Sequence, residues 1–183
     1  MCVIIYKPSG VSLPSYKLLL AAYNKNHDGC GFVSTKRHYK SLDFERFMDE
    51  LEKVDDSEEC IIHFRWATHG SVKKANCHPF VQNGVFFAHN GVLPIVPKKD
   101  MTDSETCFKT QIMPIVREFG YDSKFLDFSI REIIGSSRFA LMHKGKVKLY
   151  GSFNKLHGCY FSNLNFLPMS YNFHNHQFVK KIV

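Results

Sequence analysis

The cysteine at position 2 could serve as a nucleophile once the initiator methionine is removed. Methionine aminopeptidases remove Met1 when the second residue is small, so the mature chain would begin at Cys2. An α-amine has an ordinary pKa of about 8, so part of it is neutral at neutral pH. That amine could act as the general base for the thiol of its own residue. The alternative is a cysteine that merely follows the start methionine.

Arg65 is a second candidate, in a segment that reads His-Phe-Arg-Trp-Ala-Thr-His-Gly. An arginine in an apolar strand is costly to bury unless an anion pairs with it. Its planar fork matches a carboxylate with two parallel hydrogen bonds, and Thr68 and His69 could add donors to the same carboxylate. Pairing with one of the chain's own acids is the alternative, although residues 60–99 contain no Asp or Glu.

Two further segments carry groups suited to acyl transfer. A strand that ends at Asn90-Gly91 can offer a side-chain amide and a backbone N–H side by side, as in an oxyanion hole. The alternative is a plain turn, which Asn-Gly also favours. Asp103 lies in Thr102-Asp103-Ser104-Glu105, a pattern that predicts a helix start. Its carboxylate could also receive the ammonium group of an amino-acid ligand.

The spacing of cysteines and histidines argues against a metal site. Six cysteines include no C-x-x-C pair, and ten histidines include no H-E-x-x-H motif. No apolar run is long enough to span a membrane, and the first residues lack the pattern of a signal peptide. We therefore expect a cytoplasmic protein with no metal, no cofactor and no membrane contact.

The charge is unevenly distributed along the 183 residues. The formal net charge is +7, and residues 133–183 contain seven Lys or Arg and no acid. Basic and aromatic residues together suit a protein interface or a nucleic-acid surface. A solvated basic surface is the alternative, since charge alone governs solubility and non-specific binding.

Hydrophobic patterning predicts a mixed α+β fold with antiparallel hairpins rather than alternating βαβ units. The predicted helices are 15–24, 42–54, 104–119 with a kink near Pro114, and 124–134. The predicted strands are 2–7, 32–34, 60–67, 80–82, 85–89, 138–143, 146–150 and 159–162. We expect residues 163–183 to form a docked tail with little regular structure.

Taken together, these segments resemble the class II glutamine amidotransferase domain, a family of N-terminal-nucleophile hydrolases, in its compact stand-alone form. The resemblance covers roughly residues 2–165. It is carried by the N-terminal Met-Cys and by motifs that follow in family order. These motifs are His27-Asp28-Gly29-Cys30-Gly31-Phe32, Arg65-Trp66-Ala67-Thr68-His69-Gly70, Asn76-Cys77-His78-Pro79-Phe80, Ala88-His89-Asn90-Gly91 and Thr102-Asp103-Ser104-Glu105.

The resemblance implies a four-layer αββα sandwich of two antiparallel sheets and a role for each candidate residue. Cys2 would attack the glutamine side-chain amide, and Asn90 and Gly91 would form the oxyanion hole. Arg65, with Thr68 and His69, would bind the glutamine α-carboxylate, and Asp103 would bind the α-ammonium. A separate synthase or transferase on another chain would receive the ammonia.

The resemblance also implies a domain division and leaves other functions open. Residues 1–165 would form the glutamine amidotransferase domain, and residues 166–183 a basic, aromatic tail that docks on it or on the partner. One alternative is an amidohydrolase that acts alone on glutamine or a γ-glutamyl peptide. Another is a non-catalytic basic module that keeps the fold and binds protein or nucleic acid.

Overall fold

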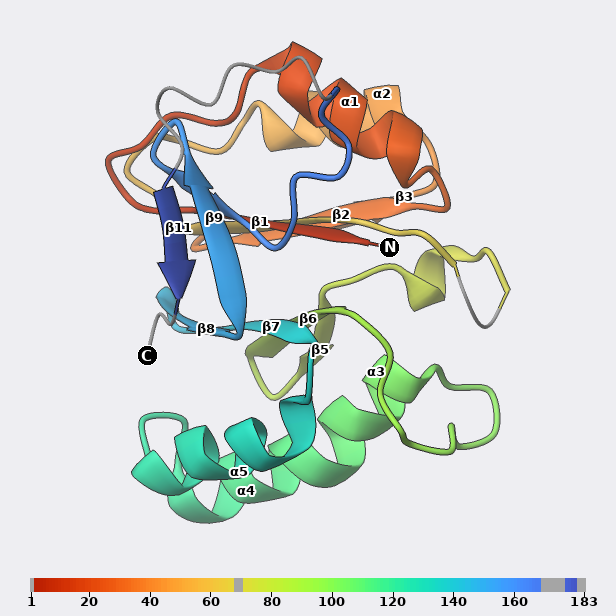
Figure 1. The fold of residues 1–183 in the computed structure, drawn as a ribbon, viewed down its shortest axis with the longest axis vertical. Coiled ribbons are helices and arrows are strands. Elements are labelled where there is room, and N and C mark those ends of the chain that lie inside the picture. The colour runs from red at the N-terminus through yellow and green to blue at the C-terminus, as the bar shows by residue number, and fades with distance from the viewer. Residues whose placement is uncertain (1, 68–70, 169–176, 181–183) are drawn as a thin grey trace.

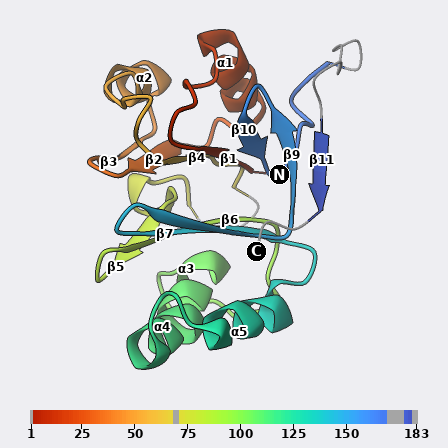
Figure 2. The same ribbon diagram turned by 90° about the vertical axis from the view of Figure 1, so that its left-hand side faces the viewer.

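The computed structural model describes residues 2–67, 71–168 and 177–180, which form two sheets between two layers of helices (Figure 1). No helix among these residues is long and apolar enough to cross a bilayer. All recorded strand pairings are antiparallel. The predicted α+β class and four-layer αββα sandwich are therefore confirmed, and Figure 2 shows the layers edge-on.

The larger sheet has seven strands, and the nucleophile candidate precedes a central one. Its order is β11 (Gln177–Lys180), β9 (Ser152–Leu156), β10 (Cys159–Phe161), β1 (Val3–Lys7), β4 (Cys60–Phe64), β2 (Cys30–Ser34) and β3 (His38–Ser41). The smaller sheet has the order β5 (Phe80–Gln82), β6 (Val85–Asn90), β7 (Arg138–His143) and β8 (Lys146–Tyr150).

Helices cover the outer face of each sheet. The larger sheet is covered by α1 (Tyr16–Lys25) and α2 (Phe44–Leu51). The smaller sheet is covered by α3 (Asp103–Cys107), a wider turn at Phe108–Ile112, α4 (Met113–Phe119) and α5 (Lys124–Ile134). Side-chain oxygens of Ser15, Asp43, Thr102 and Ser123 cap these helices by accepting a backbone N–H of the first turn.

Side-chain alternation along the central strands builds three cores. In β1, Val3 and Ile5 pack toward α1 and α2, whereas Ile4 faces the other sheet. Ile4 meets Ala88 and Ala140 of the smaller sheet in the layer between the two sheets. Because β1 is buried on both faces, it holds the residue that precedes it in a well-defined place.

Several predicted elements differ from the structure. The strand predicted to reach residue 67 ends at Phe64. The predicted helix 104–119 is divided by a π-type turn just before Pro114, which lacks the N–H that a continuous helix requires. Strands β3 and β9 were not predicted, and the expectation of little regular structure after residue 162 is wrong at β11. Its four residues pair with the edge of β9, and this pairing outweighs their weak local pattern.

Candidate active site

A pocket brings together four residues that the sequence singles out from distant positions. Cys2, Arg65, Gly91 and Asp103 all line it, and they come from the start of β1, the end of β4, the end of β6 and the start of α3. The other lining residues are Trp66, Ala67, Asn76, His78, His89, Thr102 and Ser104. Thr68 and His69 lie outside the described residues.

Cys2 contacts the backbone of the Arg65-Trp66 segment. The Trp66 N–H donates to Cys2 Sγ at 3.3 Å, and the thiol lies 3.5 Å from the Trp66 carbonyl oxygen. Burial raises the pKa of the thiol above its ordinary value, although the Trp66 hydrogen bond and the Arg65 charge oppose this. The thiol is therefore protonated at neutral pH and needs a base before it can attack a carbonyl.

The buried Arg65 is positioned by the turn at Asp28-Gly29. Its backbone N–H donates to the Gly29 carbonyl at 2.8 Å, and its own carbonyl accepts the Asp28 N–H at 3.0 Å. Asp28 Oδ2 also accepts the Ala67 N–H at 2.7 Å. The Arg65 guanidinium donates to the Ser71 carbonyl at 3.3 Å. A carboxylate in the pocket would meet a cation that the surrounding backbone already holds in place.

The two glycines of the Asp28-Gly29-Cys30-Gly31 motif allow a second segment to approach this turn. A Cβ atom on Gly29 would collide with Cys77 Sγ, and one on Gly31 would collide with the His78 carbonyl oxygen. Gly29 also has a φ of +134°, which L side chains rarely adopt. These close contacts place the Asn76–His78 segment against the wall of the pocket.

Asn90 and Gly91 lie at the end of β6. Gly91 has a φ of +147° and lies so close to Ser137 that a Cβ atom would collide with its side chain. Asn90 precedes Gly91 but is not among the residues that line the pocket; it is buried, and its Nδ2 donates to Ser162 Oγ at 2.8 Å. One N–H of the amide remains for a further acceptor, so the segment can supply a side-chain and a backbone donor together.

Asp103 is the first residue of α3, as the capping pattern predicts. Its Oδ2 accepts the Leu93 N–H at 3.1 Å, and its Oδ1 accepts the Ser104 N–H at 2.8 Å. These bonds hold the half-buried carboxylate at the pocket wall. The pocket therefore offers both a fixed anion and a fixed cation, which suits a zwitterionic ligand.

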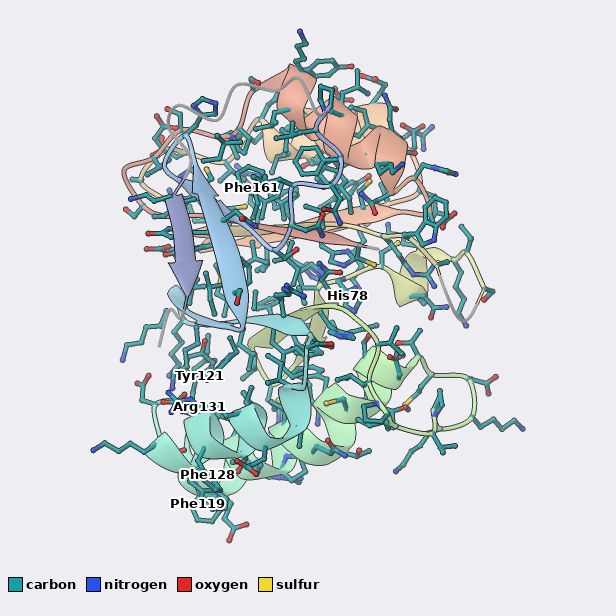
Figure 3. The ribbon with its side chains drawn as sticks, viewed as in Figure 1. His78, Phe119, Tyr121, Phe128, Arg131 and Phe161 are labelled. Carbon is teal, nitrogen blue, oxygen red and sulfur yellow. The ribbon has the colours of Figure 1, made fainter. Side chains whose placement is uncertain are left out.

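Three buried histidines lie close to the pocket, and Figure 3 labels one of them, His78. His63 lies on the face of β4 that meets the smaller sheet, whereas His89 lies on the face of β6 that the helices cover. His63 Nε2 lies 3.2 Å from the His89 carbonyl oxygen and 3.1 Å from His78 Nδ1. His89 Nδ1 lies 2.8 Å from Ser104 Oγ, and its Nε2 lies 3.1 Å from Ser137 Oγ. Burial lowers the pKa of His63 to about 3 and of His89 to about 4, and lowers that of His78 well below its ordinary value. All three are neutral at pH 7.

Comparison with known families accounts for the motifs of this pocket. The model of the class-II glutamine amidotransferases matches residues 36–149. The chain belongs to this family. The matched range contains Arg65, Asn90, Gly91 and Asp103, whereas Cys2 precedes it.

Curated relatives of this glutamine amidotransferase domain match over short segments. A stretch of 31 residues is 58% identical to the isomerizing glutamine–fructose-6-phosphate aminotransferase of Xylella fastidiosa strain Temecula1, and covers 17% of this chain and 5% of that enzyme. A stretch of 33 residues is 46% identical to the enzyme of the same name from Buchnera aphidicola, and covers 18% of this chain and 5% of that enzyme. The aligned segment is thus a small part of these relatives.

Solved structures support the fold of the domain over most of its length. The glutamine phosphoribosylpyrophosphate amidotransferase from B. subtilis, complexed with ADP and GMP, superposes with a TM-score of 0.59 at 17% identity. The superposition covers 88% of this chain and 41% of the B. subtilis chain. A structure of the allosteric regulatory enzyme of purine biosynthesis gives the same TM-score and coverage at 18% identity.

The amidotransferase pocket also depends on residues that the sequence did not single out for a role. His63, His78 and His89 all lie within recognisable motifs, so the motif pattern could have flagged them. Ser137, Ser162 and Asn163 were assigned no role, because they meet the site only through folding. Among the described residues, no group of three or more His, Cys, Asp or Glu is placed to hold a metal ion.

Proposed function

We propose that this domain hydrolyses the side-chain amide of glutamine through a γ-glutamyl thioester on Cys2 and releases ammonia for an acceptor enzyme on another chain. The observation that carries the proposal is the shared pocket of Cys2, Arg65, Gly91 and Asp103. A nucleophile, a cation, an oxyanion donor and an anion meet there, and glutamine offers one complementary group to each.

Substrate binding uses the two charged groups. Arg65 binds the α-carboxylate through its guanidinium, with Thr68 and His69 as further donors. Asp103 binds the α-ammonium. Because Arg65 and Asp103 are each held by backbone hydrogen bonds, they fix the substrate at two points and place its side-chain amide near Cys2.

The reaction follows from the state of the thiol. The α-amine of Cys2, exposed by removal of Met1, takes the thiol proton while sulfur forms a bond to the amide carbon. Asn90 Nδ2 and the Gly91 N–H stabilise the tetrahedral oxyanion. The amine then returns the proton to the departing nitrogen, and the C–N bond breaks to leave ammonia and the thioester. Water hydrolyses the thioester, and glutamate leaves with the thiol restored.

The inference that the ammonia passes to an acceptor rests on the curated relatives. The curated relatives are named for amino transfer from glutamine to fructose 6-phosphate, and they are far longer than the segment they share with this chain. We infer that this domain likewise serves an ammonia-accepting synthase or transferase. A cytoplasmic location follows from the same inference, since small amino-group acceptors are made and used there. The glutamine reaction itself calls for no metal or cofactor.

Glutamine turnover by the purified protein tests the proposal. We expect glutamate and ammonia in equal amounts, and an intact mass that shows loss of Met1. Cys2→Ala should abolish turnover, whereas Cys159→Ala, which removes a buried thiol of β10, should retain it. A glutamine-like diazo-ketone should label Cys2 and spare the other five cysteines. Labelling elsewhere, or turnover by Cys2→Ala, would contradict the mechanism.

A further inference from the structure

Two residues that follow β10 contact both halves of the reaction site. Ser162 comes directly after Phe161, which Figure 3 labels in the core of the larger sheet. Ser162 exchanges two hydrogen bonds with Ile4. The Ile4 N–H donates to Ser162 Oγ at 2.8 Å, and the Ser162 N–H donates to the Ile4 carbonyl at 2.9 Å. The next residue, Asn163, donates from Nδ2 to the Cys2 carbonyl at 2.8 Å. The strand that carries the nucleophile is thus held at Cys2 and at Ile4.

The same serine reaches across to the oxyanion strand. Asn90 Nδ2 donates to Ser162 Oγ at 2.8 Å, so one hydroxyl joins β1 of the larger sheet to the end of β6 in the smaller sheet. Ser162 is 1% exposed and Asn90 is 2% exposed. A hydrogen bond shielded from water to this degree holds its partners in a narrow range of positions.

The hydroxyl can hold the Asn90 amide in either of two orientations. In the orientation observed, Asn90 Oδ1 is buried without a hydrogen-bond partner among the described residues. A rotation of 180° about the Cβ–Cγ bond exchanges the two ends of the amide. Ser162 then donates its own O–H to Oδ1, since a hydroxyl both donates and accepts. The Nδ2 group takes the place at which Oδ1 has no partner, and Ser162 then uses neither of its N–H groups.

We propose that Ser162 is a positioning residue that holds the Asn90 side chain in place and ties it to the strand that carries Cys2. This inference rests on the function proposed above. Oxyanion stabilisation depends on donors that are aimed before charge develops. The hydrogen bond from Asn90 to Ser162 holds the proposed oxyanion donor in place. The hydrogen bonds between Ser162 and Ile4 fix the distance from that donor to the strand that carries Cys2.

Steady-state kinetics of Ser162→Ala separates positioning from substrate binding. Ser162 bonds to Ile4 and Asn90, which are not the groups proposed to bind the glutamine charges, so KM for glutamine should stay within about twofold while kcat falls by about tenfold or more. Ser162→Thr, which keeps a hydroxyl, should recover most of the kcat. The matched control is Ser34→Ala, which removes another buried strand hydroxyl, bound to Glu58 and remote from the pocket. It should leave kcat unchanged.

A double variant tests whether Ser162 acts through Asn90. In an Asn90→Ala background, Ser162→Ala should lower kcat by no more than about twofold, because the donor that it orients is already gone. Equal losses in both backgrounds, or a loss no greater than that of Ser34→Ala, would overturn the proposal.

An NMR comparison keeps the inference separate from the proposed function. The Asn90 side-chain amide signals should shift and exchange faster with water in Ser162→Ala, and should be unaffected in Ser34→Ala. If the wild-type protein does not hydrolyse glutamine, the proposed function fails, and the NMR comparison alone decides whether Ser162 orients Asn90. Unchanged Asn90 signals in Ser162→Ala would reject that role.

Discussion

The state of the Cys2 sulfur determines how the reaction must begin. Burial raises the pKa of this thiol, so it holds its proton at neutral pH, and the Trp66 backbone contacts both its lone pair and its hydrogen. The proposed mechanism therefore needs a base that takes this proton when sulfur attacks, and the α-amine of Cys2 can supply it.

The first prediction concerns the pH dependence of the reaction. The α-amine must be neutral to act as a base, so kcat/KM for glutamine should rise with pH and level off above about 8. The assay is glutamate release between about pH 6 and pH 9. Insertion of a lysine between Met1 and Cys2 should retain the methionine and abolish the activity, because the amine of Cys2 is then an amide. Full activity in that variant would rule out the amine as base.

The second prediction separates binding from chemistry. Arg65→Lys loses the fork that matches a carboxylate, and Asp103→Asn loses the charge that pairs with an ammonium, so both should raise KM for glutamine. Asn90→Ala should mainly lower kcat, by about a hundredfold, because the oxyanion exists only along the reaction path. Initial rates over a range of glutamine concentrations give both constants. The same pattern in all three variants would refute this division of roles.

At the scale of elements, β1 is held at both ends by polar contacts. Asn163 and Ser162 hold the end near Cys2. At the other end, the fully buried ammonium of Lys7 donates to the carbonyl oxygens of Asp55, Asp56 and Glu58 at 3.1, 2.7 and 2.7 Å. All three of its N–H groups are thus used, and the strand is fastened to the loop that follows α2.

The third prediction concerns how much the hydrogen bonds of Lys7 stabilise the folded protein. Lys7→Met should lower the free energy of unfolding by about 2 to 4 kcal/mol, because three buried carbonyls lose a charged donor. Lys53→Met removes an exposed lysine paired with Glu50 and should cost less than about 1 kcal/mol. Urea unfolding of both variants makes the comparison. If the free energy of unfolding fell by similar amounts in the two variants, the buried Lys7 would stabilise the protein no more than an exposed lysine does.

The elements that were predicted correctly share a strong local signal. Asn83-Gly84 and Lys144-Gly145 form two-residue turns in which both residues have positive φ, and both hairpins were predicted. His157-Gly158 has the same geometry between β9 and β10, but this turn was not predicted because β9 was not recognised as a strand. Of the site, motif residues such as Arg65 and Asn90 were readable, and whether they act as proposed awaits the kinetic tests. The role of Ser162 was not readable, because its partners lie about 70 and 160 residues away and only the packing of the two sheets brings them together.

At the scale of the molecule, strand β11 lies apart from the strand that follows Cys2. Strand β11 forms the edge of the larger sheet, and β9 and β10 separate it from β1.

The fourth prediction follows from this strand order. Deletion of residues 170–183 should leave kcat and KM for glutamine within about twofold while it lowers stability, since an edge pairing is lost. If the basic tail docks the acceptor enzyme, the deletion should also abolish ammonia transfer. Loss of glutamine hydrolysis in a folded deletion variant would show that the glutamine reaction depends on residues 170–183.

The fifth prediction concerns His63, His78 and His89, which are buried in the neutral form. Their folded-state pKa values lie far below the value of about 6.5 expected in the unfolded chain. As pH falls below 6.5, these histidines bind protons in the unfolded chain but not in the folded chain. The free energy of unfolding should therefore fall by up to about 1.4 kcal/mol per pH unit for each histidine. The loss should continue until pH approaches the folded values of about 4 for His89 and about 3 for His63.

Urea unfolding at pH 7 and pH 5 tests this acid sensitivity in a window where the histidines dominate. The carboxylates with resolved shifts, Asp55, Glu58 and Asp122, have lowered pKa values and stay charged in the folded state above pH 5. In NMR spectra, the ring signals of His63 and His89 should remain those of neutral imidazole at pH 5.5. A stability that is equal at pH 7 and pH 5, or rings that titrate near 6.5, would mean that the protein interior admits a charge at these positions.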